Sequence, residues 1–275
     1  MPGLMEGKRG LVMGVANDHS IAWGIAKTLA VHGAELAFTY QGEALGKRVK
    51  PLAEQVGSSF LMPCDVEDIA SVDAVFAEVG RRWGKMDFLV HAIAFSDKNE
   101  LKGRYADSTR ANFIRTMVIS CYAFTEAAKR AAALMPDGGA MVTLTYNGGD
   151  RAMPNYNVMG VAKAALEASV RYLAVDFGPQ NIRVNAISAG PIRTLAGAGI
   201  TDARYMFAFQ QKYSPLGRGV TLEELGGAGL YLLSELSGGV TGEIHFVDSG
   251  YNVIAMPQPE ALKAAGGKVE NGNGS

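Results

Sequence analysis

Two tyrosines and a lysine stand at a spacing that suits the stabilisation of a developing negative charge. Tyr156 opens a predicted helix over 157–177, and Lys163 follows it by seven residues. Seven residues are nearly two helical turns, so both side chains share one face, and the lysine leans back toward the tyrosine. A cation in that place favours an ionised or strongly donating phenol. Gly160 lies between them and leaves room for a flat ligand, while Tyr146 closes the preceding strand.

These side chains need a scaffold, and apolar runs that alternate with helix-length segments provide one. Strands are expected at 10–15, 35–40, 59–66, 86–94, 139–146, 182–188 and 243–250. Helices are expected at 21–33, 43–55, 69–84, 108–134, 157–177, 201–213 and 221–235. Because the strands are almost continuously apolar, they suit a parallel sheet that is buried on both faces. The pattern predicts one α/β domain over residues 1–257, with a doubly wound parallel sheet of about seven strands and helices on both faces. Residues 258–275 are expected to form a disordered tail.

Composition excludes several other classes of protein. The chain has 275 residues, a net charge of −1 and 48% hydrophobic residues, so no global positive field recruits nucleic acid or an anionic membrane. The N-terminus lacks the apolar core of a secretory signal, and no apolar run is long enough to span a membrane. Cys64 and Cys121 are expected to be reduced core thiols, and the four histidines lack metal-ligand spacing. The expected location is cytoplasmic, and no metal is expected.

The first strand ends at a glycine turn that leads into a helix. Gly14 ends the strand, and Ser20 occupies the position of a helix cap. Free N–H groups at such a helix start bind the pyrophosphate in dinucleotide-binding folds. The spacing is not G-x-G-x-x-G, so an ordinary strand–helix turn stays open as an alternative.

The ends of the next three strands carry further candidates for the same ligand. Gln41 stands where an acid would bind the adenosine ribose, Asp65 can accept from an adenine amino group, and Ile93 lies among small residues. Lys47 and Arg48 are placed to meet a 2′-phosphate, so these residues leave the choice between NADH and NADPH open. Sheet packing explains each residue alone equally well. Together they mark the crevice at the carboxyl ends of one sheet.

Longer blocks of the chain resemble the short-chain dehydrogenase/reductase superfamily. Most members carry Y-x-x-x-K, whereas position 160 here is Gly. The Y-x6-K spacing, with Tyr146 ten residues upstream, is similar to the divergent enoyl-[acyl-carrier-protein] reductase branch of bacterial fatty acid synthesis. The resemblance runs from Lys8 to about Met256 and includes the blocks ELAFTYQ, PNYNVMG and RVNAISAGPIRTLA. The run NGGDRA after Tyr146 departs from the family's usual sequence but leaves the tyrosines and the lysine in place.

This resemblance implies a Rossmann-like reductase that uses NADH, with NADPH not excluded, on the trans-2 double bond of an enoyl thioester. Tyr156 would stabilise the enolate oxygen, Lys163 would hold the nicotinamide ribose, and Tyr146 would line the acyl site. Implied catalytic residues are therefore Tyr146, Tyr156 and Lys163. Implied cofactor residues are Gly14, Ser20, Ile21, Gln41, Asp65, Val66, Ile93, Lys163, Ile192, Thr194 and Ala196. Implied substrate residues are Ser96, Tyr146, Tyr156, Met206 and Phe207, the last two in a lid over about 191–213.

The resemblance also implies acyl carrier protein as the partner and a homotetramer as the assembly. Because acyl carrier protein is acidic, Arg193, Arg204 and Lys212 are candidate contacts, although plain solvent exposure explains them as well. Two alternative functions stay open at this point. A reductase of keto groups is disfavoured by Gly160, and a silent dinucleotide-binding regulator is disfavoured by the retained tyrosine–lysine pair.

Overall fold

Seven parallel strands form one sheet in the order β3-β2-β1-β4-β5-β6-β7. The structure is a computed structural model and describes residues 3–192 and 203–256. The strands are β1 (Arg9–Met13), β2 (Glu35–Tyr40), β3 (Phe60–Pro63), β4 (Phe88–His91), β5 (Gly139–Thr145), β6 (Ile182–Ala189) and β7 (Ile244–Val247). Each neighbouring pair is parallel, so the predicted doubly wound α/β fold is confirmed.

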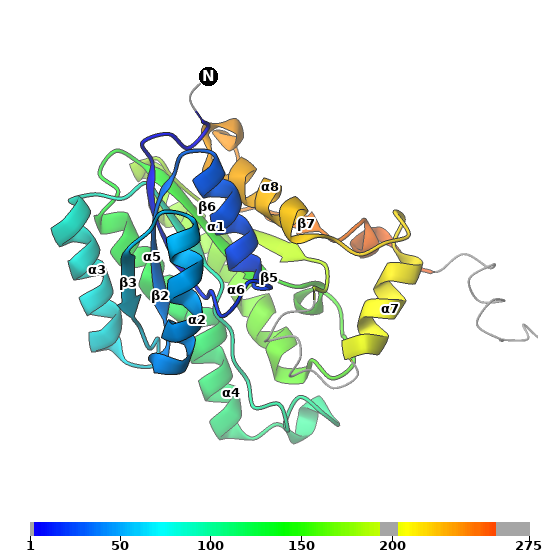
Figure 1. Ribbon diagram of the computed structural model, residues 1–275. Helices are drawn as coiled ribbons and strands as arrows, with labels where there is room; N and C mark the ends of the chain where they lie inside the picture. The colour runs from blue at the N-terminus through cyan, green and yellow to red at the C-terminus, as the bar shows by residue number, and fades with distance from the viewer. Residues whose placement is uncertain (1–2, 193–202, 257–275) are drawn as a thin grey trace, which may run out of the picture.

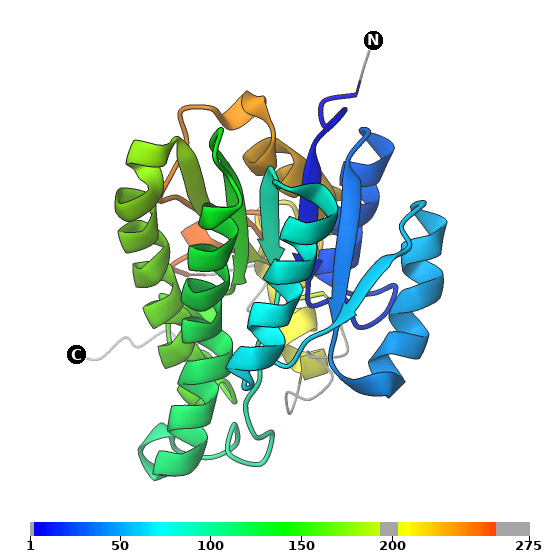
Figure 2. The ribbon, with the colours of Figure 1, turned by 90° about the vertical axis from the view of Figure 1, so that its left-hand side faces the viewer.

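Helices cover both faces of this sheet. They are α1 (Ile21–Val31), α2 (Gly42–Gln55), α3 (Ile69–Trp83), α4 (Arg110–Met117), α5 (Ala123–Ala133), α6 (Asn157–Phe177), α7 (Ala203–Tyr213) and α8 (Leu222–Leu233). One layer holds α1, α2 and α8, and the other holds α3, α5 and α6, which stand in front of the strands in Figure 2. The yellow helix α7 stands outside both layers (Figure 1).

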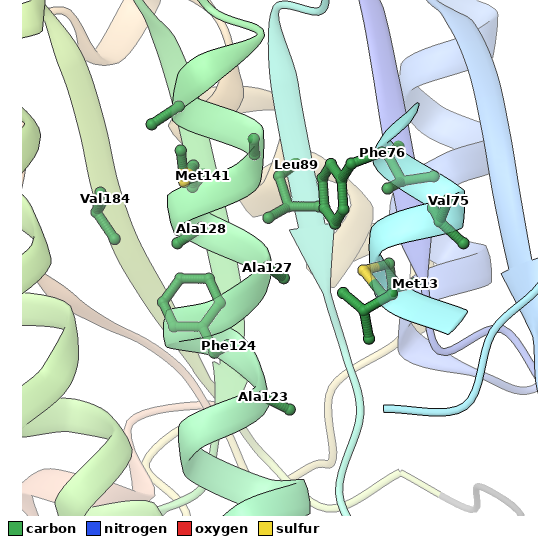
Figure 3. Packing of buried hydrophobic residues seen from close by; sticks show 14 of the residues in the cluster. Met13, Val75, Phe76, Leu89, Ala123, Phe124, Ala127, Ala128, Met141 and Val184 are labelled. Carbon is green, nitrogen blue, oxygen red and sulfur yellow. The ribbon is translucent and has the colours of Figure 1, made fainter. Parts of the chain in front are cut away.

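Alternate side chains of each strand enter two separate cores. Leu11 of β1 packs on the α3, α5 and α6 side, and its neighbour Val12 packs on the α1, α2 and α8 side. In the first core, Phe76 of α3 and Phe124 of α5 lie with Leu89 of β4 (Figure 3). Burial of each such side chain contributes about 1.5–3 kcal/mol. Packing on both faces fixes the sheet whose strand ends carry the candidate site.

The chain reverses its winding between β1 and β4. It passes outward from β1 to β2 and β3, and then returns so that β4 pairs with the other side of β1. Open parallel sheets bind ligands at such a switch point, beyond the carboxyl ends of the strands. Gly14, directly after β1, has a φ of 102°, and a Cβ there would overlap the carbonyl oxygen of Ala92. Only glycine allows these two strand ends to approach so closely.

The predicted helix over 108–134 differs from the observed structure in its middle. It begins at Arg110 as α4, passes through a π-helical turn over Val118–Tyr122, and continues as α5. A π turn holds one extra residue per turn and is frequent at functional sites. By contrast, the predicted helix over 157–177 is confirmed with the same bounds in α6.

Cys64 and Cys121 are buried and free, as predicted. No helix in 3–192 or 203–256 is long and apolar enough to cross a bilayer. The predicted tail at 258–275 lies outside the described residues, as does the part of the predicted lid over 193–202.

Candidate active site

A cavity of about 610 Å³ lies at the carboxyl ends of β4, β5 and β6. It brings together nine of the residues predicted from sequence: Ile21, Ile93, Ser96, Tyr146, Tyr156, Lys163, Ile192, Met206 and Phe207. The small residues Ala92, Ala94, Ala189 and Gly190 are also part of the wall. The cavity is large enough for a small-molecule ligand and has the mainly apolar lining typical of such sites.

The two tyrosines enter the cavity from the end of β5 and the start of α6. Tyr146 directly follows β5, and Tyr156 is the residue before the first turn of α6. Their rings meet edge to face with centroids 5.1 Å apart. Burial is the main cause that raises the pKa of both hydroxyls above the ordinary range. Of the two phenol states that the sequence left open for Tyr156, a raised pKa favours the neutral hydrogen-bond donor over the ionised form.

Lys163 places a buried ammonium on α6, seven residues after Tyr156. Its side chain has 6% exposure, and its Nζ donates to the carbonyl oxygen of Leu144 at 2.7 Å. Burial lowers the pKa of Lys163 to about 8. The ammonium is thus anchored on β5. It does not lower the pKa of Tyr156 below the ordinary value, because the burial of that hydroxyl raises the pKa. Among the residues that the structure describes, the other two N–H donors of Lys163 have no partner, so they are available to a ligand.

Gly160 serves a different purpose from the one predicted. A Cβ on this residue would come 2.7 Å from the carbonyl oxygen of Gly148, in the loop that follows Tyr146. Gly160 also does not line the cavity. Its missing side chain leaves room for that loop to pack on α6, so the prediction that it makes space for a flat ligand is wrong.

The loop after β4 is held by side chains from α4 and the π turn. The Ser120 hydroxyl accepts from the Phe95 N–H at 2.9 Å and donates to the Phe95 carbonyl at 3.0 Å. Asn112 accepts from the Asp97 N–H at 3.0 Å and donates to the Ser96 hydroxyl at 3.1 Å. Ser120 and Asn112 were not predicted, because nothing in the sequence marks a π turn or a loop anchor. Together they fix Ser96 at the cavity wall.

The start of α1 offers N–H groups to an anion. Ser20 stands at the cap position, as predicted, but its hydroxyl accepts from the N–H groups of Ala16 at 3.0 Å and Asn17 at 3.1 Å. It therefore shapes the preceding loop and does not cap the helix. Within the described part of the chain, no partner accepts from the N–H groups of Ile21 and Ala22. Unpaired donors at the positive end of a helix suit a phosphate.

Three predicted cofactor residues lie at the neighbouring strand ends, beyond the cavity wall. Gln41, after β2, donates through Nε2 to Asp65 Oδ2, after β3, at 3.1 Å. Val66 is buried in the core, so only its backbone is available to a ligand. Gly14, directly after β1, and Ser20, at the start of α1, also lie off the wall. All five stay at the carboxyl end of the sheet, which fits a long ligand that crosses from β3 to β5.

Two of the remaining predicted residues lie on α7. Met206 is buried and Phe207 half-buried, and both line the cavity. Thr194 and Ala196 lie outside the described residues.

Two further polar groups surround the tyrosines and were missed by the sequence reasoning. Gln210 of α7 donates through Nε2 to the Tyr146 hydroxyl at 2.7 Å. Glu167, one turn beyond Lys163, accepts from the Thr145 hydroxyl at 2.6 Å, and burial raises its pKa. The helical spacing of Lys163 and Glu167 was a signal for the second group, whereas no local pattern connects residues as distant as Gln210 and Tyr146.

The fold and the site together are those of a short-chain dehydrogenase/reductase. A family model described as enoyl-(acyl carrier protein) reductase matches residues 14–252. The chain is 75% identical over 265 residues to an enoyl-[acyl-carrier-protein] reductase (NADH) of Rhizobium meliloti, a match that covers 96% of this chain and 99% of that protein. The chain belongs to the enoyl-[acyl-carrier-protein] reductase family, so the predicted family and enzyme class are confirmed.

Two solved structures are similar over almost the whole described chain. FabI from Candidatus Liberibacter asiaticus has a TM-score of 0.92 at 61% identity, covering 94% of this chain and 100% of that chain. The reductase from Anaplasma phagocytophilum, solved in complex with NAD, has a TM-score of 0.91 at 56% identity, covering 94% of this chain and 98% of that chain.

Proposed function

We propose that this chain uses NADH to reduce the trans-2 double bond of enoyl thioesters carried on acyl carrier protein. This reaction is the last reductive step of fatty acid elongation. The main support is the apolar cavity in which two neutral phenols and a buried ammonium converge from β5 and α6. The name of the Rhizobium meliloti relative and the NAD complex of the Anaplasma phagocytophilum protein point to the same cofactor.

The proposed cofactor site runs along the carboxyl ends of β1 to β6. The unpaired N–H groups at the start of α1 would hold the pyrophosphate, and the two remaining Lys163 donors would hold the nicotinamide ribose hydroxyls. Gln41 and Asp65 would meet the adenosine end, and the backbone of Ile192 would meet the carboxamide. When bound, the nicotinamide supplies a hydride for the β-carbon of the substrate. The small side chains Ala92, Ala94 and Gly190 support this assignment, because they allow close approach to the backbone.

The proposed role of Tyr156 is to donate a hydrogen bond to the thioester oxygen. Negative charge develops on this oxygen as the enolate forms, and protonation of the α-carbon then completes the reduction. A neutral phenol with a raised pKa keeps its proton, so it stabilises the oxyanion as a donor. The buried Lys163 ammonium adds positive charge in surroundings with little water to screen it.

The acyl chain is proposed to lie against the apolar side of the cavity. Phe95 and Leu101 come from the loop after β4, Met159 from α6, and Met206 and Phe207 from α7. These side chains offer apolar surface without competing donors near the thioester. Ser96, held by Asn112, would neighbour the substrate at the same wall.

The proposed partner is acyl carrier protein, and the proposed assembly is a homotetramer in the cytoplasm. Lys212 is exposed on α7, the helix that lines the cavity, whereas the side chains of Arg193 and Arg204 lie outside the described part of the chain. Tyr172 and Val175 on α6 are 76% and 74% exposed, and large exposed apolar side chains on one helix support a contact between subunits.

A substrate comparison tests the proposal. The purified chain is mixed with NADH and either a trans-2-enoyl or a 3-ketoacyl thioester of equal chain length, and cofactor oxidation is followed by absorbance. We expect oxidation with the enoyl thioester. Activity with the ketoacyl thioester alone would indicate the keto reductase alternative, and tight NADH binding without turnover of either would indicate the silent regulator. Replacing NADH by NADPH in the same assay measures the cofactor preference.

A further inference from the structure

Gln210 is a buried amide that bonds to one of the two cavity tyrosines. Its side chain has 4% exposure, and its Nε2 lies 2.7 Å from the Tyr146 hydroxyl oxygen. Its Oε1 is also buried and has no hydrogen-bond partner among the residues in 3–192 and 203–256. An apolar side chain would fill this position without leaving a polar atom unpaired. Packing alone therefore does not explain a glutamine here.

The direction of this hydrogen bond decides where the Tyr146 proton points. Tyr146 stays neutral, since burial raises its pKa, so its oxygen keeps one proton. The amide N–H of Gln210 occupies the acceptor side of that oxygen, which turns the tyrosine's own proton away from Gln210. In the described part of the chain no group accepts this proton, and Tyr146 lines the cavity. The proton is available to a ligand in the cavity.

Aromatic contacts next to Gln210 help to hold α7, the helix that carries it. The ring of Phe209 lies 4.3 Å from that of Tyr213 and 6.4 Å from that of Tyr251, measured between centroids. The Ser214 N–H donates to the Gln210 carbonyl at 2.8 Å. Of these contacts, the ring pair of Phe209 and Tyr251 connects α7 to the segment after β7, next to the turn of α7 that presents the amide to Tyr146.

We propose that Gln210 is a positioning residue that keeps the Tyr146 hydroxyl as a hydrogen-bond donor toward the thioester oxygen. This inference rests on the proposed enoyl reduction and adds Tyr146, which lines the same cavity as Tyr156, as a second donor. A phenol that accepts a hydrogen bond becomes a stronger donor, so the amide both orients and polarises Tyr146. Gln210 acts through Tyr146 and does not itself touch the reacting atoms.

Three single variants separate this role from a structural one. Gln210→Met keeps the length of the side chain and removes the donor, whereas Gln210→Glu introduces a carboxylate that accepts the Tyr146 proton. Gln211→Met, at the next and exposed position, is the matched control. We expect kcat to fall about tenfold in Gln210→Met and at least as far in Gln210→Glu, with the control within about twofold of the unmodified enzyme. The Kd for NADH should change less than about twofold in all three.

The pH profile supplies a readout that a packing defect would not move. As pH falls from about 8 toward about 5, the introduced carboxyl of Gln210→Glu becomes protonated and regains a donor. Its kcat, relative to that of the unmodified enzyme, should therefore recover, and that of Gln210→Met should not. Full activity of Gln210→Glu at about pH 8 would show that Tyr146 donates to residue 210 and would overturn the proposal.

A double-mutant cycle with Tyr146→Phe completes the test. If Gln210 acts through the Tyr146 hydroxyl, Gln210→Met should cost less than about twofold in the Tyr146→Phe background. An equal loss in both backgrounds, or an unchanged kcat in Gln210→Met alone, would overturn the proposal. If Gln210→Met does not fold, the same cycle with Gln210→Glu decides. Failure of the proposed function looks different, because the unmodified chain would then not oxidise NADH with an enoyl thioester.

Discussion

Replacing Lys163 by Met should stabilise the fold while it weakens cofactor binding. Burial lowers the Lys163 pKa from 10.5 to about 8, and one pKa unit corresponds to about 1.4 kcal/mol. The buried ammonium therefore lowers the free energy of unfolding by about 3 kcal/mol at neutral pH. Methionine removes that cost but takes a charged donor from the Leu144 carbonyl, which costs about 1.5 kcal/mol. We expect a net gain of about 1.5 kcal/mol at about pH 7.

The sign of the pH dependence follows from the lowered pKa. Between about pH 8 and 10.5 the unfolded lysine holds a proton that the folded lysine has lost, so the stability of the unmodified chain rises relative to Lys163→Met. The advantage of the variant should therefore shrink across this window. Urea unfolding at fixed protein concentration, at about pH 7 and about pH 10.5, measures both differences. Lys129→Met, at an exposed position on α5, is the control.

The same variant should bind NADH at least about tenfold more weakly, because hydrogen bonds from a charged group contribute about 1.5–3 kcal/mol. A Lys163→Met protein that unfolds at lower urea than the unmodified chain at about pH 7 would refute this reasoning. It would mean that the bond to Leu144, and not the burial of charge, dominates at this position.

Three other changes test neighbouring parts of the site. Ser120→Ala removes the hydrogen bonds to both backbone groups of Phe95, so it should raise KM for the enoyl thioester more than it changes kcat in steady-state kinetics. An unchanged KM would mean that the loop does not need this anchor. Gly160→Ala places a Cβ 2.7 Å from the Gly148 carbonyl oxygen and should lower the free energy of unfolding, measured by urea titration, by about 1–3 kcal/mol. Equal stability would show that the loop can move away without cost. Lys212→Glu should raise KM for an enoyl thioester on acyl carrier protein but not for the same acyl group on a small thiol; equal effects on both would argue against contact with the carrier.

The fold could be predicted from the sequence because it depends on local patterns that the structure does not override. The central strands, such as β4, are apolar runs that burial on both faces requires, and α6 spans the predicted 157–177 with buried residues along its length. The π turn over Val118–Tyr122 was not predictable in this way, since it changes hydrogen bonding without changing the apolar pattern. Its consequence, the bond from Ser120 to Phe95, was missed with it.

Within the site, the tyrosines and Lys163 were predictable from spacing, but their electrostatics were not. The helical geometry left an ionised or a strongly donating Tyr156 open, whereas burial raises the pKa of this phenol and favours the neutral donor. The ammonium of Lys163 donates to the Leu144 carbonyl. Gly160 was predicted to leave room for a ligand because only its position on the helix was known. The space beside it is filled by the loop that contains Gly148, which the helical spacing does not reveal. Gln210 reaches Tyr146 across 64 residues of sequence, and no one-dimensional pattern connects them.

The most direct test of the proposed reaction is the rate of enoyl thioester reduction by Tyr156→Phe under saturating NADH. Loss of one donor to a developing oxyanion costs about 10²–10³-fold in kcat at other enzymes, and we expect a loss of that size here. The Kd for NADH, measured by fluorescence on the same protein, should stay within about twofold, because the variant leaves the proposed cofactor contacts intact. An unchanged kcat in Tyr156→Phe, or a loss that appears only in NADH binding, would contradict the assignment of Tyr156 as the group that stabilises the enolate.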